Sequence, residues 1–161
     1  MKKVTLTTEK VLAAYNVIST AKYSKLDDAN KVKVWKIARA MKPVADKFAD
    51  DRDDAAKKLM PTEDFEERRV KAQQYQAMLG DKQADMTQAP MTPTEFWKFI
   101  EESNGYNKLL ADALNDFGKK EVKVSFEPIS EEAFGKLMTS NDWTFEFALK
   151  LGEIICGNTE E

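Results

Sequence analysis

The sequence predicts a mainly α-helical protein of the α+β class, a compact helical domain with a minor two-stranded β element formed by an N-terminal and a late strand. Apolar residues recur every three or four positions over long stretches, which is typical of helices with one buried face. Charged residues make up 33% of the chain, above the average of about 25%. Two short segments instead alternate apolar and polar residues, as half-buried strands do.

The length of the chain predicts the number of domains. A chain of 161 residues has the size of one ordinary domain, and folding at this size buries roughly 70% of the surface that the unfolded chain exposes. We therefore expect residues 1–161 to form a single helical domain.

The first elements are a short strand and a helix. The segment 4–6, Val-Thr-Leu, alternates in polarity and predicts a strand. A threonine at position 7 or 8 then supplies an N-cap for a helix over about residues 9–22. One face of this helix is apolar, formed by Val11, Leu12, Tyr15 and Ile18.

The strongest helical pattern begins after Asp27 and Asp28 and extends to Leu59. Its apolar residues recur at helical spacing and are Val34, Ile37, Met41, Val44, Ala45 and Phe48. Pro43 lies inside the pattern, where its ring crowds the carbonyl of Arg39 and supplies no N–H to bond it. We therefore expect either a kink at Pro43 or two abutting helices.

The middle of the chain predicts a helix, a loop and a well-marked helix start. The helix is expected over about residues 61–79, and Gly80 ends it. Residues 80–91 have the composition of a loop, and we expect this loop to be flexible. Residues 92–95, Thr-Pro-Thr-Glu, combine an N-cap threonine, a proline at the first helical position and a glutamate at the third, which together form a capping box.

Helices and one strand are expected in the last third. The helix begun by the capping box should end near Gly105, and another should follow as far as Gly118. Residues 122–126 alternate as a half-buried strand, which we expect to pair with the opening strand. Ser130 then caps a short helix.

The chemistry-bearing residues argue against catalysis. The chain has no histidine, so Ser-His-Asp, Cys-His and HExxH arrangements are impossible. It contains neither a GxxxxGK[ST] nor a GxGxxG loop, and Cys156 is its single cysteine. The densest carboxylate group, residues 50–54, is interpreted as a solvated helix face. We therefore expect no enzyme activity, no catalytic residue, no metal site and no cofactor.

Charge is unevenly distributed along the chain. Residues 1–49 hold 11 basic and 4 acidic side chains, residues 50–69 hold 5 and 8, and residues 70–161 hold 9 and 16. The favoured interpretation is that these segments complement one another within the fold, and the alternative is an anionic partner for the first segment. Since the chain has no apolar stretch typical of a signal peptide or a membrane span, we expect a cytoplasmic protein without membrane contact.

The second predicted helix carries a candidate partner-binding face. A helical wheel spreads its basic residues from about 0° to 160° and places Trp35 among them at about 40°. An aromatic ring amid cations suits an acidic protein partner or single-stranded nucleic acid. The favoured alternative is that Trp35 packs under a neighbouring helix while the lysines reach water. The candidate residues are Lys31, Trp35, Lys36, Arg39 and Lys42.

The closing helix is a candidate oligomer interface. It is expected from Trp143 to Cys156, with Asn141 or Asp142 as its cap, and it is apolar on more than one side. Burial in the core is favoured, and an interface with a second copy or a partner is the alternative. The candidate interface residues are Trp143, Phe145, Phe147, Leu149 and Leu151.

Three stretches together resemble small helical proteins of unknown function encoded by tailed bacteriophages and prophages. They are VTLTTEKVLAAYNVI, KIARAMKPVADKFADDRDDAAKKL and VKVSFEPISEEAFGKLMTSNDWTFEFALKLGEII. The resemblance covers roughly residues 3–59 and 121–155, whereas the middle looks like an insertion. It carries over no functional residues.

The resemblance implies a non-enzymatic phage-type accessory or assembly protein that acts by protein-protein interaction in the bacterial cytoplasm, or with the virion. Its partner would be a phage structural protein or a host protein, and a second copy of the chain is a further expected partner. One alternative is a phage inhibitor of a host factor or defence system. The other is an anionic-ligand or nucleic-acid binder that uses the basic helix face, although no nucleic-acid motif supports it.

Overall fold

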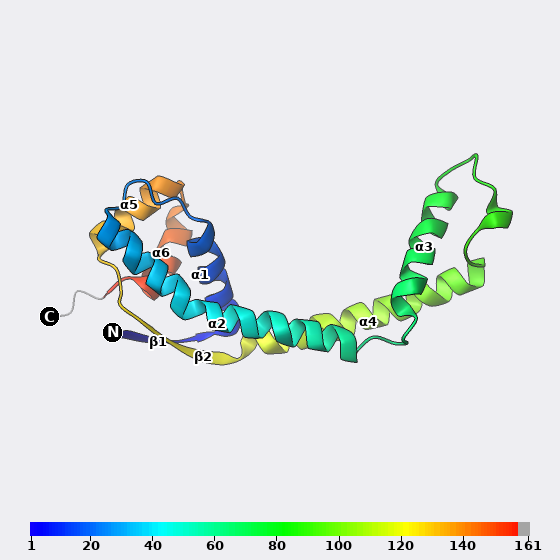
Figure 1. Ribbon diagram of the computed structural model, residues 1–161, viewed down its shortest axis with the longest axis horizontal. Helices are drawn as coiled ribbons and strands as arrows, with labels where there is room; N and C mark the ends of the chain where they lie inside the picture. The colour runs from blue at the N-terminus through cyan, green and yellow to red at the C-terminus, as the bar shows by residue number, and fades with distance from the viewer. Residues whose placement is uncertain (158–161) are drawn as a thin grey trace. The chain divides into compact units, whose positions relative to one another are not determined.

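The computed structural model describes residues 1–157 and shows a mainly α protein with a minor β element, as the sequence predicts. Within these residues there are six α-helices and a two-stranded antiparallel sheet, and 71% of the described residues are helical (Figure 1). The elements in chain order are β1 (Lys2–Thr7), α1 (Thr8–Thr20), α2 (Asp28–Lys58), α3 (Phe65–Leu79), the 3₁₀ turn η1 (Met86–Gln88), α4 (Pro93–Lys119), β2 (Glu121–Phe126), α5 (Glu131–Asn141) and α6 (Phe145–Ile155).

Residue contacts divide the chain into two compact units. Met1–Asp51 and the chain from Asp116 onward form the first unit, and Arg52–Asn115 form the second. Because α2 and α4 each contain one boundary, the chain passes between the units inside a helix both times. The single helical domain expected over residues 1–161 from the length of the chain stays a prediction.

The first unit is built around the sheet. β1 and β2 pair antiparallel with Val4 opposite Val124, which confirms the predicted pairing of the opening and late strands. Helices α1, α2, α5 and α6 contribute to the core that forms against this sheet (Figure 1). The buried residues of this core are Val11, Ala14, Ile18, Leu26, Val34, Ile37, Met41, Val124, Phe126, Ile129, Ala133, Leu137, Leu151 and Ile155.

Helix α6 is held at both ends. At its start, Thr144 Oγ1 accepts a hydrogen bond from the backbone N–H of Phe147 at 3.3 Å. At its end, Lys2 Nζ donates to the carbonyl oxygens of Glu153 at 2.8 Å and of Cys156 at 2.6 Å. A lysine beside the last carbonyls is favourable because the C-terminal end of a helix carries partial negative charge.

The cap predicted for this last helix is wrong. Asp142 has a φ of 54°, a left-handed conformation that ends α5. The side chain of Asn141 accepts a hydrogen bond from the N–H of Lys22 at 2.6 Å and donates to the carbonyl of the same residue at 2.9 Å. Because both residues have other roles, α6 begins at Phe145 rather than at Trp143.

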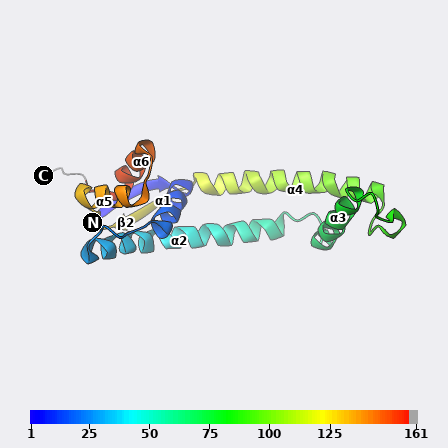
Figure 2. The same ribbon diagram turned by 90° about the horizontal axis from the view of Figure 1, so that it is seen from above.

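The second unit contains α3, η1 and the adjoining parts of α2 and α4, and Figure 2 shows the loop that carries η1 between α3 and α4. The predicted capping box is confirmed. Thr92 Oγ1 accepts from the N–H of Glu95 at 3.2 Å, and Glu95 Oε2 accepts from the N–H of Thr92 at 3.5 Å. The core residues of this unit are Phe65, Ala72, Tyr75, Met91, Phe96, Phe99 and Tyr106.

Three helix boundaries differ from the sequence prediction. The alternative of two helices abutting at Pro43 is wrong, since α2 continues through the proline. The expected end near Gly105 is also wrong, because α4 runs through it as one helix. A helical glycine costs only about 1 kcal/mol, and burial of neighbouring residues such as Phe99 and Tyr106 offsets that cost. Helix α3 starts at Phe65, several residues later than expected.

Candidate partner-binding site

Four of the five predicted partner-binding residues line one open cavity. Lys31, Trp35, Arg39 and Lys42 come from successive turns of α2. They share a face because residues three or four positions apart lie one above another on a helix. The cavity has a volume of about 600 Å³, and the rest of its lining is Tyr15, Ile18, Ser19, Tyr23 and Ala38.

The opposite wall of this cavity, which we call the Trp35 cavity, comes from α1 and the turn after it. Ile18 is fully buried and belongs to the core of the first unit. The hydroxyl of Tyr23 donates a hydrogen bond to the carbonyl of Ile18, and burial raises the pKa of the Tyr23 phenol. Ser19 Oγ donates to the carbonyl of Tyr15 at 2.6 Å. These bonds tie part of the wall to the backbone, so the wall is built independently of any ligand.

Trp35 is exposed. Trp35 retains 57% of its accessible surface, so the favoured expectation that it packs under a neighbouring helix is wrong. The guanidinium carbon of Arg39 lies 5.3 Å from the centroid of the indole ring, within range of a cation-π contact. The guanidinium of Arg39 therefore lies beside an aromatic surface that water still reaches.

The cations around the Trp35 cavity differ in what they bind. Lys31 Nζ lies 3.5 Å from Asp28 Oδ1, and Lys42 Nζ lies 2.6 Å from Asp46 Oδ2. The hydrogen bond and the charge of Asp46 raise the pKa of Lys42. Within residues 1–157, no carboxylate lies within salt-bridge distance of Arg39. Arg39 is therefore the cavity cation whose charge the described part of the chain leaves unneutralised.

Lys36 does not join the other four residues. It is exposed but stands about 100° further round the helix than Trp35, and it does not line the Trp35 cavity. It lies instead near Glu127, whose pKa is lowered first by a hydrogen bond and ion pair with Lys33 at 3.1 Å and further by the charge of Lys36. The predicted partner-binding face thus divides into the four residues of the Trp35 cavity and Lys36, which lies near Glu127.

Sequence reasoning missed the contribution of α1 to the site. Tyr15 falls on the apolar face of the first predicted helix, and nothing in the sequence marks it as part of a binding site. The structure places Tyr15 only partly in the core, and the remainder of its side chain faces the Trp35 cavity. No sequence signal marked Tyr23, because its role depends on the turn that brings it beside α2.

The predicted oligomer interface also divides into two sets. Leu151 is buried, and Trp143 and Phe147 are half-buried with ring centroids 5.5 Å apart. In contrast, Phe145 and Leu149 retain 75% and 54% of their accessible surface. These two residues are four positions apart on α6 and therefore share an outward face, which we call the Phe145 patch.

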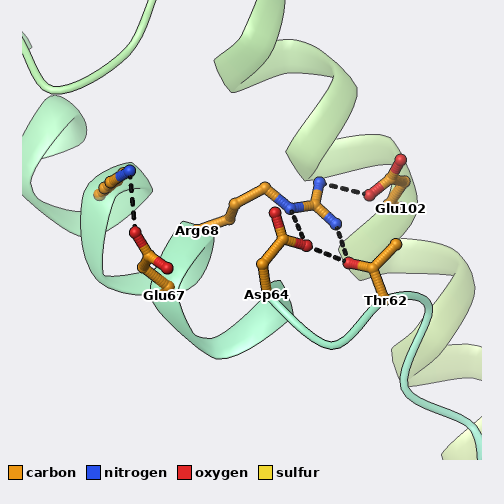
Figure 3. Close-up of polar contacts among 6 residues, drawn as sticks. Thr62, Asp64, Glu67, Arg68 and Glu102 are labelled. Atoms are coloured by element: carbon orange, nitrogen blue, oxygen red, sulfur yellow. Dashed lines mark hydrogen bonds and ion pairs between the residues drawn. The ribbon is translucent and has the colours of Figure 1, made fainter.

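A polar cluster in the second unit is centred on Arg68, whose side chain donates to three partners (Figure 3). Arg68 donates to Glu102 Oε2 at 2.6 Å, to Asp64 Oδ1 at 3.3 Å and to Thr62 Oγ1 at 2.6 Å. The hydrogen bond from the Thr62 hydroxyl, together with Arg68, lowers the pKa of Asp64, and the hydrogen bond with Glu102 raises the pKa of Arg68. Since Arg68 lies in α3 and Glu102 in α4, their hydrogen bond fastens α3 to α4.

Within residues 1–157, no three side chains of the histidine, cysteine, aspartate or glutamate type are grouped so that they could hold a metal ion. Burial raises the pKa of the Cys156 thiol, which makes the nucleophilic thiolate scarcer at neutral pH. Of the helices in the described chain, none is both long and apolar enough to cross a membrane.

No protein family matches the chain, and neither a curated protein nor a solved structure is significantly similar to it.

Proposed function

We propose that this protein acts without catalysis, by binding another protein through the Trp35 cavity. One observation carries the proposal: an exposed tryptophan stands beside an unneutralised arginine in an open cavity. Tryptophan and arginine are the residue types most enriched at the energetic centres of protein interfaces.

The phage resemblance supplies the biological setting of this proposal. A phage-type accessory or assembly protein would meet a phage structural partner in the bacterial cytoplasm and could remain with the virion. The alternative of a phage inhibitor would use the same cavity to bind a host factor or a component of host defence. The identity of the bound protein separates these two roles.

Capture from a phage-infected bacterial lysate tests the proposal. We expect the wild-type protein to retain a partner that Trp35→Ala loses, with affinity at least about tenfold weaker, because truncation of a central tryptophan typically costs 2 kcal/mol or more. Trp97→Ala is the matched control, since Trp97 is also exposed but lies in the second unit. Equal retention by Trp35→Ala and wild type would contradict the proposal.

A second candidate function is self-association through the Phe145 patch. The specific observation is that two large apolar side chains of α6 face outward, whereas Leu151 and Ile155 of the same helix are buried in the core. Removing such a pair from water favours association in proportion to the apolar area buried. This candidate is compatible with partner binding, because the Trp35 cavity is lined by α1 and α2 and not by α6.

A further inference from the structure

The positive charges of the lysines at the two ends of the Trp35 cavity are already paired with carboxylates. Lys31 and Lys42 stand eleven residues apart on α2, roughly 16 Å along the helix, and each is paired with an aspartate of its own helix. Arg39 lies between them and has its unneutralised charge beside Trp35. The cavity therefore has one cation available to a ligand, and a lysine–aspartate pair lies at either end of it. It does not form a continuous basic groove.

Arg39 has the donor geometry for one particular kind of anion. A guanidinium presents N–H donors in a planar fork that matches the two oxygens of a carboxylate. Stacking against an aromatic ring occupies the face of the guanidinium and leaves its edges available to donate. Within residues 1–157 the guanidinium of Arg39 donates no hydrogen bond, so its donors are available beside Trp35.

The remainder of the cavity is suited to an apolar side chain. Its floor and walls include Ile18, Ala38 and the rings of Tyr15 and Trp35. A volume of about 600 Å³ lies within the range of about 300–1,000 Å³ found for ligand pockets. One aromatic or large aliphatic side chain fits in this space, and it would cover the exposed indole.

A nucleic-acid strand fits this arrangement less well than a peptide does. Phosphodiester backbones bring a charge at every nucleotide, and the proteins that bind them provide grooves with many available cations. Here the lysines at the two ends are each paired with an aspartate, which leaves little net positive charge there to attract the next phosphates. A single carboxylate next to an apolar side chain matches both the charge and the size of the site.

We infer that the Trp35 cavity binds an acidic segment of a protein partner, in which one aspartate or glutamate carboxylate pairs with Arg39 and an adjacent aromatic side chain packs against Trp35. This inference rests on the proposed function and specifies the chemistry of the partner at the same cavity.

Titration of the ¹⁵N-labelled full-length protein with the peptide N-acetyl-Gly-Phe-Glu-Gly-amide tests the inference by NMR. The three tryptophan indole N–H signals are assigned with Trp→Phe variants, and Trp97 and Trp143 act as internal references. We expect only the Trp35 signal to shift at peptide concentrations up to about 10 mM, with a Kd about tenfold weaker for the glutamine analogue of the peptide. No shift at Trp35, or equal affinity for the two peptides, would overturn the inference.

Two variants of α2 distinguish a direct contact between Arg39 and the peptide carboxylate from a general effect of positive charge on binding. Arg39→Gln and Lys36→Gln each remove one positive charge from an exposed position of the same helix, but Lys36 does not line the cavity. We expect Arg39→Gln to weaken binding of the glutamate peptide about tenfold and to leave the glutamine peptide unchanged, whereas Lys36→Gln should affect neither. Circular dichroism verifies that both variants retain the helical fold.

The outcomes distinguish this inference from the proposed function. A captured partner that Trp35→Ala loses but Arg39→Gln retains would overturn the inference and leave protein binding at the cavity standing. A partner that both variants retain would overturn both. Saturation of the Trp35 shift by an oligothymidine at lower concentration than by the peptide would overturn the inference in favour of nucleic acid.

Discussion

At the scale of single residues, the second unit shows how hydrogen bonds fix a charged group in place. Arg68 stands above two aromatic rings of the core, with its guanidinium carbon 5.9 Å from the Phe65 centroid and 5.8 Å from that of Phe99. Its donors are directed at three oxygen partners (Figure 3). Arg39 has a similar aromatic contact but no carboxylate partner in residues 1–157, which is why we assign binding to Arg39 and a structural role to Arg68.

The lowered pKa of Asp64 predicts a pH dependence of stability. A carboxyl whose pKa is lower in the folded than in the unfolded state binds its proton more readily when unfolded. The stabilisation it provides is therefore complete above its unfolded pKa of about 3.9 and is lost as the pH falls through the lower folded value. We expect the difference in unfolding free energy between wild type and Asp64→Asn to shrink as the pH falls from about 6 to 3.

Urea unfolding at a series of pH values measures this difference. Asp81→Asn is a suitable control, since it removes an exposed aspartate of the same unit that makes no salt bridge within residues 1–157. A constant difference between wild type and Asp64→Asn across the series would show that Asp64 has no linked effect.

At the scale of elements, local sequence signals located two of the helix starts that a side chain caps, those of α4 and α5. Ser130 Oγ accepts from the N–H of Ala133 at 3.1 Å, as predicted for the start of α5. The capping box at Thr92 forms in both directions. The start of α6 was misplaced because Asn141, Asp142 and Thr144 are all good N-cap types, and the choice among them depends on the contact of Asn141 with the distant Lys22.

The capping box predicts a measurable loss of stability. Thr92→Ala removes the oxygen that accepts from the N–H of Glu95, so we expect the unfolding free energy to fall by about 1 kcal/mol in urea denaturation. Thr94→Ala on the same helix turn is the control, because Thr94 is exposed and follows the cap. Because alanine has a higher helix propensity than threonine, we expect Thr94→Ala to cause no loss, and a loss of similar size in both variants would contradict the capping explanation.

At the scale of the whole molecule, the charge asymmetry of the sequence is partly resolved by contacts within the first unit. Lys33, from the basic segment, pairs with Glu127, from the acidic one, at 3.1 Å. Lys31 and Lys42 pair instead with aspartates of their own helix. Complementation between segments thus accounts for some of the asymmetry, and Arg39 keeps a charge available for a partner.

Self-association through the Phe145 patch is a prediction at this scale. We expect a dimer or larger oligomer in size-exclusion chromatography with light scattering, shifted toward monomer by the pair Phe145→Ser and Leu149→Ser, since the two changes remove the exposed apolar pair of α6. Leu109→Ser is the control, because Leu109 is equally exposed but lies in the second unit. A wild-type protein that stays monomeric at high concentration would remove this candidate function.

The sequence by itself determined the helical class, the pairing of the two strands and most helix starts, because these depend on short-range periodicity and capping. It also predicted a shared face of α2 for five residues from helical geometry alone, and four of them line one cavity. Only the tertiary structure decided that Trp35 is exposed, that Tyr15 and Tyr23 complete its cavity, and that Lys36 belongs elsewhere. Exposure depends on which elements pack over a helix face, and that choice is made by contacts between residues far apart in the chain.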